Sequence, residues 1–241
     1  MAKKLKTYFN WSSGKDASLA LYHLQKQGKY QVDRLLTSIN TSYDRVSMHG
    51  LCRELLERQI RALGLPLTTI ELPERPSMEV YRHEMERVVK ELKSQGYTHS
   101  GFGDIFLEDL RTYREAQLRT FNITCCFPLW KRDTTALIKE FLDLGFKAIV
   151  VCIKADLLDV SFVGREIDEG FIDDLPPNVD PCGENGEFHT FCFDGPIFGH
   201  PIEFVVGEKV YREYLAPRTE RAGESPGTMG FWFCDLLPID E

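Results

Sequence analysis

The sequence predicts an α/β fold in which a doubly wound parallel sheet is followed by a smaller α+β C-terminal domain. Short apolar runs alternate with segments of helical periodicity from residue 5 to about residue 155. Beyond that point prolines and glycines interrupt the rhythm, and further apolar runs follow. Because alternating strands and helices form parallel sheets that helices cover on both faces, the first region should be the doubly wound sheet.

The apolar runs and the helical patterns follow one another in a regular order. Strands are expected over residues 5–11, 32–39, 67–72, 97–102, 123–129 and 146–154. Helices are expected over residues 15–27, 50–63, 77–95, 107–120 and 134–144. In the longest of these helices, apolar residues recur from Met78 to Leu92 at helical spacing, which indicates one buried face.

The C-terminal region differs in composition. Pro176, Pro177 and Pro181 break the helical pattern, and residues 188–193, 202–206 and 231–237 read as strands. Residues 216–230 carry two prolines and three glycines, so a mobile loop is expected there. A boundary near residue 130 gives domains of residues 1–130 and 131–241, the second packing over the sheet edge where α/β folds bind ligands.

Charge and cysteine content narrow the class of protein. The net charge of −8 argues against broad nucleic-acid binding, because no basic excess is present to displace counterions. The first residues lack an apolar segment of the secretory kind, and no run is long enough to span a membrane, so a cytoplasmic location is expected. Seven cysteines without a CxxC pair favour buried thiols over a metal site, and Cys125 and Cys126 should face opposite sides of a strand.

The turn after the first strand, Ser12-Ser13-Gly14-Lys15-Asp16-Ala17-Ser18, has the composition of an anion-binding loop. Small residues let the backbone approach an anion, and the free N–H groups at the start of the next helix favour phosphate. Lys15 adds a full positive charge. The motif lacks the residues of a Walker A loop, and a helix cap formed by the serines and the aspartate is the alternative interpretation.

A second candidate site follows the strand expected over residues 97–102. Gly101 and Gly103 permit close backbone approach, and Asp104 is a candidate ligand of Mg²⁺. A glycine–aspartate turn that caps the next helix is the alternative. Arg111 and Arg114 lie three residues apart on that helix, so they face together either a substrate anion or a neighbouring glutamate.

A third candidate site lies in the C-terminal region, in Gly183-Glu184-Asn185-Gly186-Glu187-Phe188-His189. Glu184 and Glu187 beside His189, on a glycine-rich loop, have the chemistry to bind Mg²⁺ or to transfer protons. A hairpin with exposed acids is the alternative.

Together these motifs resemble a known family. Ser-Ser-Gly-Lys-Asp resembles the SGGKDS PP-loop of the N-type ATP pyrophosphatases, with Ser13 in place of a glycine and Ala17 in place of a serine. The Gly-Asp-Ile segment, the following Tyr-Arg-Glu helix and the Phe-Pro-Leu-Trp segment narrow the resemblance to the diphthine–ammonia ligase family. That family has a similar GEGGE string in its second domain; here Asn185 replaces a glycine, and His189 falls where an acid is common.

The resemblance runs from Tyr8 to about Phe204 and implies roles for the candidate residues. Residues 1–130 would form a Rossmann-like PP-loop ATP-binding domain of the HUP type, and residues 131–241 a substrate or closure domain. The implied catalytic residues are Lys15, Glu184 and Glu187, and the implied Mg²⁺ ligands are Asp16 and Asp104. The implied ATP contacts are Ser12, Ser13, Gly14, Lys15, Asp16, Ser18, Thr37, Ser38, Ile39, His49, Gly101, Gly103 and Asp104.

The resemblance also implies a two-step amidation. A substrate carboxylate attacks the α-phosphate of ATP, giving an acyl-adenylate and pyrophosphate, and ammonia then displaces AMP. Residue 2 is alanine, so there is no N-terminal cysteine to hydrolyse glutamine, and free ammonium is the expected nitrogen donor. The acceptor is a small-molecule carboxylate or a modified protein side chain; in the family's namesake reaction it is a modified histidine of a translation elongation factor. Association into a homo-oligomer is compatible with the sequence.

Two other classes of function use the same motifs. One is tRNA thiolation or base modification, against which the acidic charge and the absence of a CxxC pair and of a recognisable RNA-binding module count. The other is a nucleotide-binding regulator without catalysis. The acids Asp104, Glu184 and Glu187 favour turnover over sensing.

Overall fold

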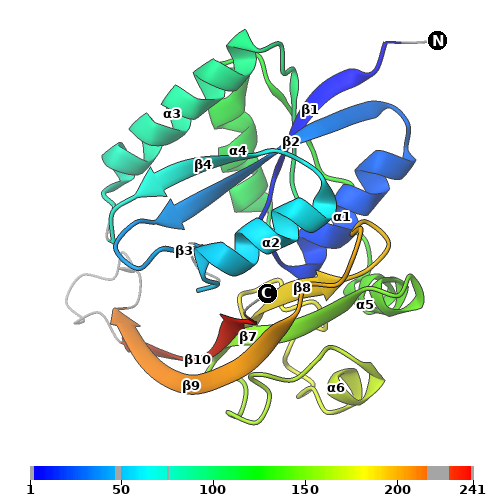
Figure 1. Cartoon of the computed structure of the whole chain (residues 1–241), viewed down its shortest axis with the longest axis vertical. Coiled ribbons are helices and arrows are strands. Elements are labelled where there is room, and N and C mark those ends of the chain that lie inside the picture. Colours follow the sequence, from blue (N-terminus) through cyan, green and yellow to red (C-terminus); the bar gives the residue numbers. More distant parts are fainter. Residues whose placement is uncertain (1–2, 47–49, 75, 216–227, 240–241) are drawn as a thin grey trace.

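The computed structural model describes residues 3–46, 50–74, 76–215 and 228–239 (Figure 1). The helices are α1 (Lys15–Lys26), α2 (Arg53–Leu63), α3 (Met78–Ser94), α4 (Glu108–Arg119), α5 (Thr134–Asp143) and α6 (Glu169–Asp173). The strands are β1 (Leu5–Asn10), β2 (Tyr30–Asn40), β3 (Arg45–Val46), β4 (Leu67–Leu72), β5 (His99–Gly101), β6 (Thr124–Cys126), β7 (Lys147–Lys154), β8 (Phe188–Asp194), β9 (Phe204–Leu215) and β10 (Thr228–Pro238).

The predicted fold class is confirmed. In the described part of the chain, the first sheet has the strand order β3-β2-β1-β5-β6, and β4 also pairs with β2. All pairs in it are parallel except β2 with the short β3. Since β1 lies in the middle of this sheet, the turn that follows β1 opens at the centre of its carboxyl edge.

Alternating side chains of the strands feed two separate cores. Phe9 and Leu35 belong to one buried cluster, whereas their neighbours Tyr8 and Leu36 belong to the other. Helices α3 and α4 cover the face of Tyr8, and helices α1 and α2 cover the face of Phe9. This is the doubly wound arrangement, because a strand exposes successive side chains to opposite faces.

The second sheet is antiparallel, with the order β8-β7-β10-β9. Figure 1 shows β7 and β8 beneath α1 and α2, so these two helices lie between the sheets. The buried cluster that contains Phe9 continues into Val150 and Phe191 of the second sheet. The alternation of strands and helices along the chain runs through β7. Within the described residues, however, β7 pairs with β8 and β10 of the C-terminal sheet and not with the first sheet.

Several element bounds differ from the sequence expectation for local reasons. Helix α2 begins at Arg53 instead of residue 50, because Gly50 has a φ of 68° and Cys52 forms a bridge with Arg45. Strand β9 continues well beyond residue 206. Its central residues are exposed on both faces of the ribbon, so they have no apolar alternation to reveal a strand. Of the loop expected over 216–230, residues 216–227 lie outside the described residues, and 228–230 begin β10.

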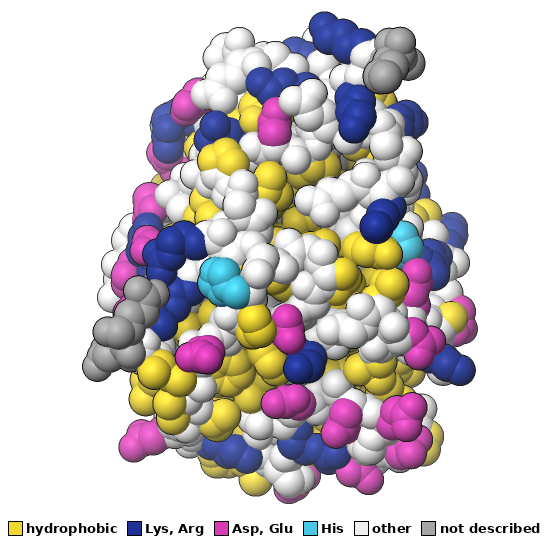
Figure 2. Space-filling view, turned by 45° about the vertical axis from the view of Figure 1, so that its right-hand side comes forward, with side chains coloured by type: hydrophobic (Ala, Val, Ile, Leu, Met, Phe, Trp, Pro, Cys, Tyr) yellow, Lys and Arg dark blue, Asp and Glu magenta, His cyan; other side chains and the backbone are white. Residues whose placement is uncertain are grey.

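The cysteines are unpaired, and the face of the molecule drawn in Figure 2 carries charges of both signs. All seven cysteines are free thiols, and Cys126 and Cys125 pack into different clusters on opposite sides of β6. On the face drawn in Figure 2, basic and acidic side chains are interspersed, with acidic ones more frequent at the lower end of the view. Among the described residues, none of the helices has the length and apolarity needed to cross a membrane.

Candidate functional site

The turn after β1 adopts a conformation that glycine favours. Ser13 has a φ of 71°, and Gly14 is extended as the N-cap of α1. A positive φ is costly for a residue with a Cβ atom, which is a physical reason for glycine at this position in the resembling motif. Ser13, Gly14 and Lys15 are all buried.

Strand β8 of the second sheet holds this turn in place. The Ser13 carbonyl accepts a hydrogen bond from the Cys192 amide at 2.9 Å. The Lys15 amide donates to the Thr190 hydroxyl at 3.0 Å. The turn is thus fixed between the edge of the first sheet and a strand more than 170 residues further along the chain.

The Lys15 side chain is buried within the site. Its Nζ lies 2.8 Å from both carboxylate oxygens of Asp16 and also donates to the Cys182 carbonyl. Burial works against the charged form, but Asp16, Cys182 and Glu184 together outweigh it, so the pKa of Lys15 lies above its ordinary value. Lys15 is therefore an ammonium cation at neutral pH, and Asp16 retains 31% of its side-chain exposure.

The two flanking serines have different environments. The Ser12 hydroxyl accepts a long bond of 3.4 Å from the Gly14 amide, and Ser12 is partly exposed. The Ser18 hydroxyl is buried and donates to the Gly14 carbonyl at 3.0 Å, one turn back along α1. Ser18 therefore braces the helix from the interior, whereas Ser12 lies at the opening of the turn.

The end of β2 leaves a short stretch of backbone beside the turn. Strand β1 pairs with β2 up to Leu36, and β3 pairs with β2 from Ile39 onward, on the side opposite β4. Only Thr37 and Ser38 lie between these two neighbours, and the Thr37 hydroxyl donates to the Trp11 carbonyl. These two residues belong to the predicted ATP contacts Thr37, Ser38 and Ile39, of which Ile39 pairs with β3. His49 lies outside the described residues.

The loop after β5 packs closely against the start of α1. A Cβ atom on Gly103 would lie 3.0 Å from the Ala17 nitrogen and 3.1 Å from the Asp16 carbonyl carbon. A Cβ atom on Gly101 would instead meet the side chains of Phe9 and Leu24. Gly103 thus allows the loop after β5 to contact the first turn of α1, which follows the loop after β1. Gly101 instead leaves room for core side chains.

Asp104 has a cationic partner from the next helix. Its Oδ2 lies 3.0 Å from Nε of Arg114, and its Oδ1 accepts from Nη2 of Arg114 at 3.2 Å. Burial raises the pKa of Asp104, and Arg114 opposes that rise. Arg111 instead pairs with Glu115 at 2.8 Å and stacks on the Trp130 ring. The two arginines therefore have different partners.

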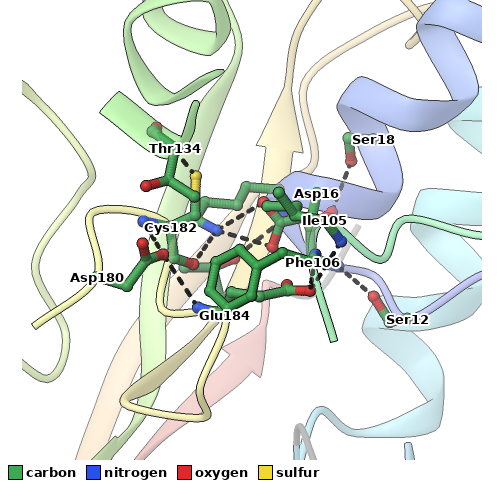
Figure 3. Close-up of polar contacts among 12 residues, drawn as sticks. Ser12, Asp16, Ser18, Ile105, Phe106, Thr134, Asp180, Cys182 and Glu184 are labelled. Atoms are coloured by element: carbon green, nitrogen blue, oxygen red, sulfur yellow. Dashed lines mark hydrogen bonds and ion pairs between the residues drawn. The ribbon is translucent and has the colours of Figure 1, made fainter. Parts of the chain in front are cut away.

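Glu184 joins the C-terminal loop to the loop after β5. Its Oε1 accepts from the Ile105 amide at 2.7 Å and from the Phe106 amide at 3.3 Å. Figure 3 shows Glu184 and Cys182 facing Asp16, Ile105 and Phe106. Burial raises the pKa of Glu184 to about 7, with Asp16 and Asp104 adding to the rise and the two backbone amides opposing it.

Glu187 and His189 complete the glycine-rich loop. Glu187 is buried, and its Oε1 accepts from the Asp180 amide at 3.1 Å and from the Asn185 side chain at 3.0 Å. Its Oε2 has no hydrogen-bond partner in the described part of the chain. Burial, together with the charge of Lys15, lowers the pKa of His189 to about 4, so His189 is neutral at neutral pH.

Asp16 and Asp104 are the predicted Mg²⁺ ligands among the carboxylates of the site. Within the residues that the structure describes, no group of three or more His, Cys, Asp or Glu side chains is placed to hold a metal. Magnesium usually takes only one or two carboxylates and completes its shell with substrate phosphates and waters. Asp16 is paired with Lys15 and Asp104 with Arg114, so a metal at the predicted ligands would have to arrive with a nucleotide that draws these cations away.

A small cavity of about 100 Å³ opens on the α3–α4 side of the same sheet edge. Its wall includes the aromatic side chains of Tyr8, Tyr81 and Phe102, together with Asn10 and Arg114. Because Arg114 also contacts Asp104, the cavity adjoins the acidic part of the site.

The sequence patterns missed one buried polar residue of the site. Gln59 of α2 is fully buried and bonds to Trp11, Ser13 and Cys192. A signal was present, because Gln59 occupies the same helix face as Leu55, Leu56 and Ala62. A polar side chain in an apolar face must find partners elsewhere in the fold.

Comparison with known protein families matches both parts of the chain to the same family. A family model described as the diphthamide synthase N-terminal domain matches residues 5–121, and one described as the diphthamide synthase C-terminal domain matches residues 133–219. The break between the two matches, residues 122–132, lies between α4 and α5 and includes β6.

Individual relatives are more distant and match in part. A diphthine–ammonia ligase of Danio rerio is 35% identical over 87 residues, which are 34% of this chain and 34% of the relative. Those of Bos taurus and Homo sapiens are 29% and 28% identical over 126 residues, which are 50% of this chain and 46% of each relative. The matched region thus spans less than half the length of these relatives.

Proposed function

Since the chain belongs to the diphthamide synthase family, we propose that it is an ATP-dependent ligase that adenylates a carboxylate, releases pyrophosphate and forms an amide with ammonia. Relatives named diphthine–ammonia ligase support this reaction class. Diphthine, or a carboxylate of similar structure, is the proposed acceptor.

The observation that carries the proposal is the setting of Lys15. A charged ammonium lies at the first turn of α1, at the carboxyl edge of a parallel sheet, beside partly exposed Asp16. Helix starts and lysine together favour the oxygens of a phosphate chain. On nucleotide binding, phosphate oxygens would replace the Cys182 carbonyl as a partner of Nζ.

In the first step, an acceptor carboxylate oxygen attacks the α-phosphorus, and the bond from that phosphorus to the bridging oxygen breaks. Pyrophosphate leaves with the electron pair of that bond. Lys15 and the N–H groups of the turn stabilise the charge that develops on the leaving group. Mg²⁺, held by Asp16 and Asp104 when bound, would neutralise further phosphate charge.

In the second step, ammonia forms a bond to the acyl carbon, and the bond from that carbon to the AMP oxygen breaks. The attacking nitrogen must then lose a proton. Glu184, whose pKa of about 7 leaves its carboxyl group poised near neutral pH, is the proposed acceptor of that proton.

We place the acceptor at the cavity between α3 and α4. Its aromatic wall suits an organic side chain, and Arg114 supplies a cation for the acceptor carboxylate. Asp104 is paired with the same Arg114, so an acceptor bound to Arg114 would lie next to the proposed metal position.

The test is to incubate the protein with Mg·ATP, ammonium and a set of acceptors that includes diphthine-bearing protein, and to resolve the nucleotide products. AMP and pyrophosphate that depend on acceptor and ammonium are expected. ADP and phosphate would contradict the proposal. Nucleotide binding without turnover on any acceptor would favour a regulator, and turnover dependent on tRNA would favour a tRNA-modifying enzyme.

A further inference from the structure

Gln59 of α2 is a fully buried polar residue whose side chain bonds to parts of the chain outside its own helix. Its Oε1 accepts from the Trp11 indole Nε1 at 2.7 Å. Its Nε2 donates to the Ser13 carbonyl at 3.1 Å and to the Cys192 carbonyl at 2.6 Å. One amide therefore connects Trp11, which directly follows β1, with the next turn and with β8.

These bonds orient a single peptide group of the turn. The Ser13 carbonyl receives two donors from the interior, Gln59 Nε2 and the Cys192 amide. In a trans peptide the carbonyl and the N–H point in opposite directions. The Gly14 N–H is therefore directed away from Gln59, toward Ser12 at the opening of the turn. Its bond to the Ser12 hydroxyl is long, at 3.4 Å.

This orientation has a conformational cost at Ser13. A φ of 71° is unfavourable for serine, so the turn needs interactions that hold it there. Gln59 supplies one of them from a position where an apolar residue would fit the helix face. Core packing alone gives no reason for a polar side chain at this place.

We propose that Gln59 is a positioning residue for phosphate binding: it holds the peptide between Ser13 and Gly14 with its N–H toward the pyrophosphate end of the nucleotide. The inference rests on the proposed function for the identity of the anion. The orientation of the peptide group can be measured without any nucleotide.

The first experiment measures the Kd for Mg·ATP and for inorganic pyrophosphate, together with the unfolding midpoint. Gln59→Glu keeps an acceptor for Trp11 but loses the donor, and Gln59→Leu loses both. Each should raise both Kd values about tenfold, equivalent to about 1.4 kcal/mol. Leu56→Ala, a buried change on the same helix, should lower the midpoint but change each Kd less than about twofold.

The same Gln59 substitution in a Ser13→Gly protein separates a positioning role of Gln59 from a packing role. In Ser13→Gly the positive φ has little cost, so the turn depends less on Gln59. The penalty of Gln59→Glu on the Kd for pyrophosphate should then be clearly smaller than in the parent protein. An equal penalty in both backgrounds, or wild-type affinity in folded Gln59→Glu, would overturn the inference.

A measurement without nucleotide keeps the two proposals separable. Amide NMR of Gly14 should show a large shift or broadening in Gln59→Glu, with the Trp11 indole signal retained and with no such change in Leu56→Ala. An unchanged Gly14 signal overturns the role of Gln59 whether or not ATP binds. If the parent protein binds neither ATP nor pyrophosphate, the proposed function fails, and the Gly14 signal still decides the role of Gln59.

Discussion

The loop after β1 and the loop after β5 lie side by side at one edge of the sheet, yet they are held in different ways. Both follow paired parallel strands, and both combine glycine with aspartate. The first loop bonds to Cys192 and Thr190 of β8. In the second, Asp104 takes its partner from the helix that follows it.

Both loops contact the C-terminal region, since the loop after β5 bonds to Glu184, but only in the first loop do the charged side chain and the left-handed residue depend on it. The second loop has a local ion pair that would form wherever β5 and α4 form. The first loop has a left-handed serine and a buried lysine, and both depend on groups contributed by the second sheet and the loop before it. We infer that the turn after β1 takes its final shape only when the two sheets are packed together.

Replacing Lys15 should have the largest effect, because it removes the cation of the first loop. Lys15→Met is expected to slow pyrophosphate release at least about 100-fold, as loss of a preorganised charge at a leaving group does. Lys26→Met, an exposed change at the other end of α1, is the control and should retain the parent rate. A Lys15→Met protein with normal turnover would remove Lys15 from the mechanism.

Gly103→Ala should break the contact between the two loops. The added Cβ meets backbone atoms of Ala17 and Asp16 at 3.0–3.1 Å, so the loops must separate. A displacement of reacting groups by a fraction of an ångström predicts about a tenfold loss in kcat/KM. Gly170→Ala in α6, whose Cβ would meet nothing closer than 3.5 Å, is the matched control. Equal kinetics for the two variants would show that the loops do not need to touch.

Glu184→Gln tests the bond between the C-terminal loop and the loop after β5 through the pH dependence of the free energy of unfolding. The folded protein raises the pKa of this carboxyl from 4.5 to about 7, so it binds the proton more tightly than the unfolded chain does. The free energy of unfolding should therefore fall as pH rises between these values, on the order of 2 kcal/mol, and Glu184→Gln should remove this fall.

At a constant concentration of free ammonia, the kinetic counterpart is an amide-forming rate that rises through about pH 7 in the parent protein and is flat and several-fold lower in Glu184→Gln. Urea unfolding and initial rates across this range give both curves. Glu57→Gln, an exposed change on α2, should leave them unaltered. A parent protein without either pH dependence would contradict the proton-accepting role.

Ser18→Ala should have the smallest effect on binding. The Ser18 hydroxyl bonds to the Gly14 carbonyl in the interior, so its loss predicts about 1 kcal/mol less stability. The Kd for Mg·ATP should change less than about twofold by calorimetry, equivalent to under 0.5 kcal/mol. A much larger loss of affinity would place this hydroxyl on the phosphates instead.

Much of the fold could be read from the chain because strands and helices leave local periodic patterns. Tyr8 and Phe9 alternate between two cores, and Met85 and Val88 recur at helical spacing, as expected. Strand β9 was underestimated because its charged residues, tyrosines and valine follow no two-residue period on a ribbon that is exposed on both sides. Periodicity reports burial, so it fails where a strand is not buried.

By itself, the sequence determined the α/β class, the position of Lys15 after the first strand and the resemblance to the family. Each depends on residues adjacent in the chain. Only the tertiary structure decided that Gln59 bonds to Cys192, 133 residues away, that Glu184 accepts from Ile105, and that β7 joins the second sheet. Such contacts depend on how separate elements pack, and no local pattern of side chains encodes the distance between them.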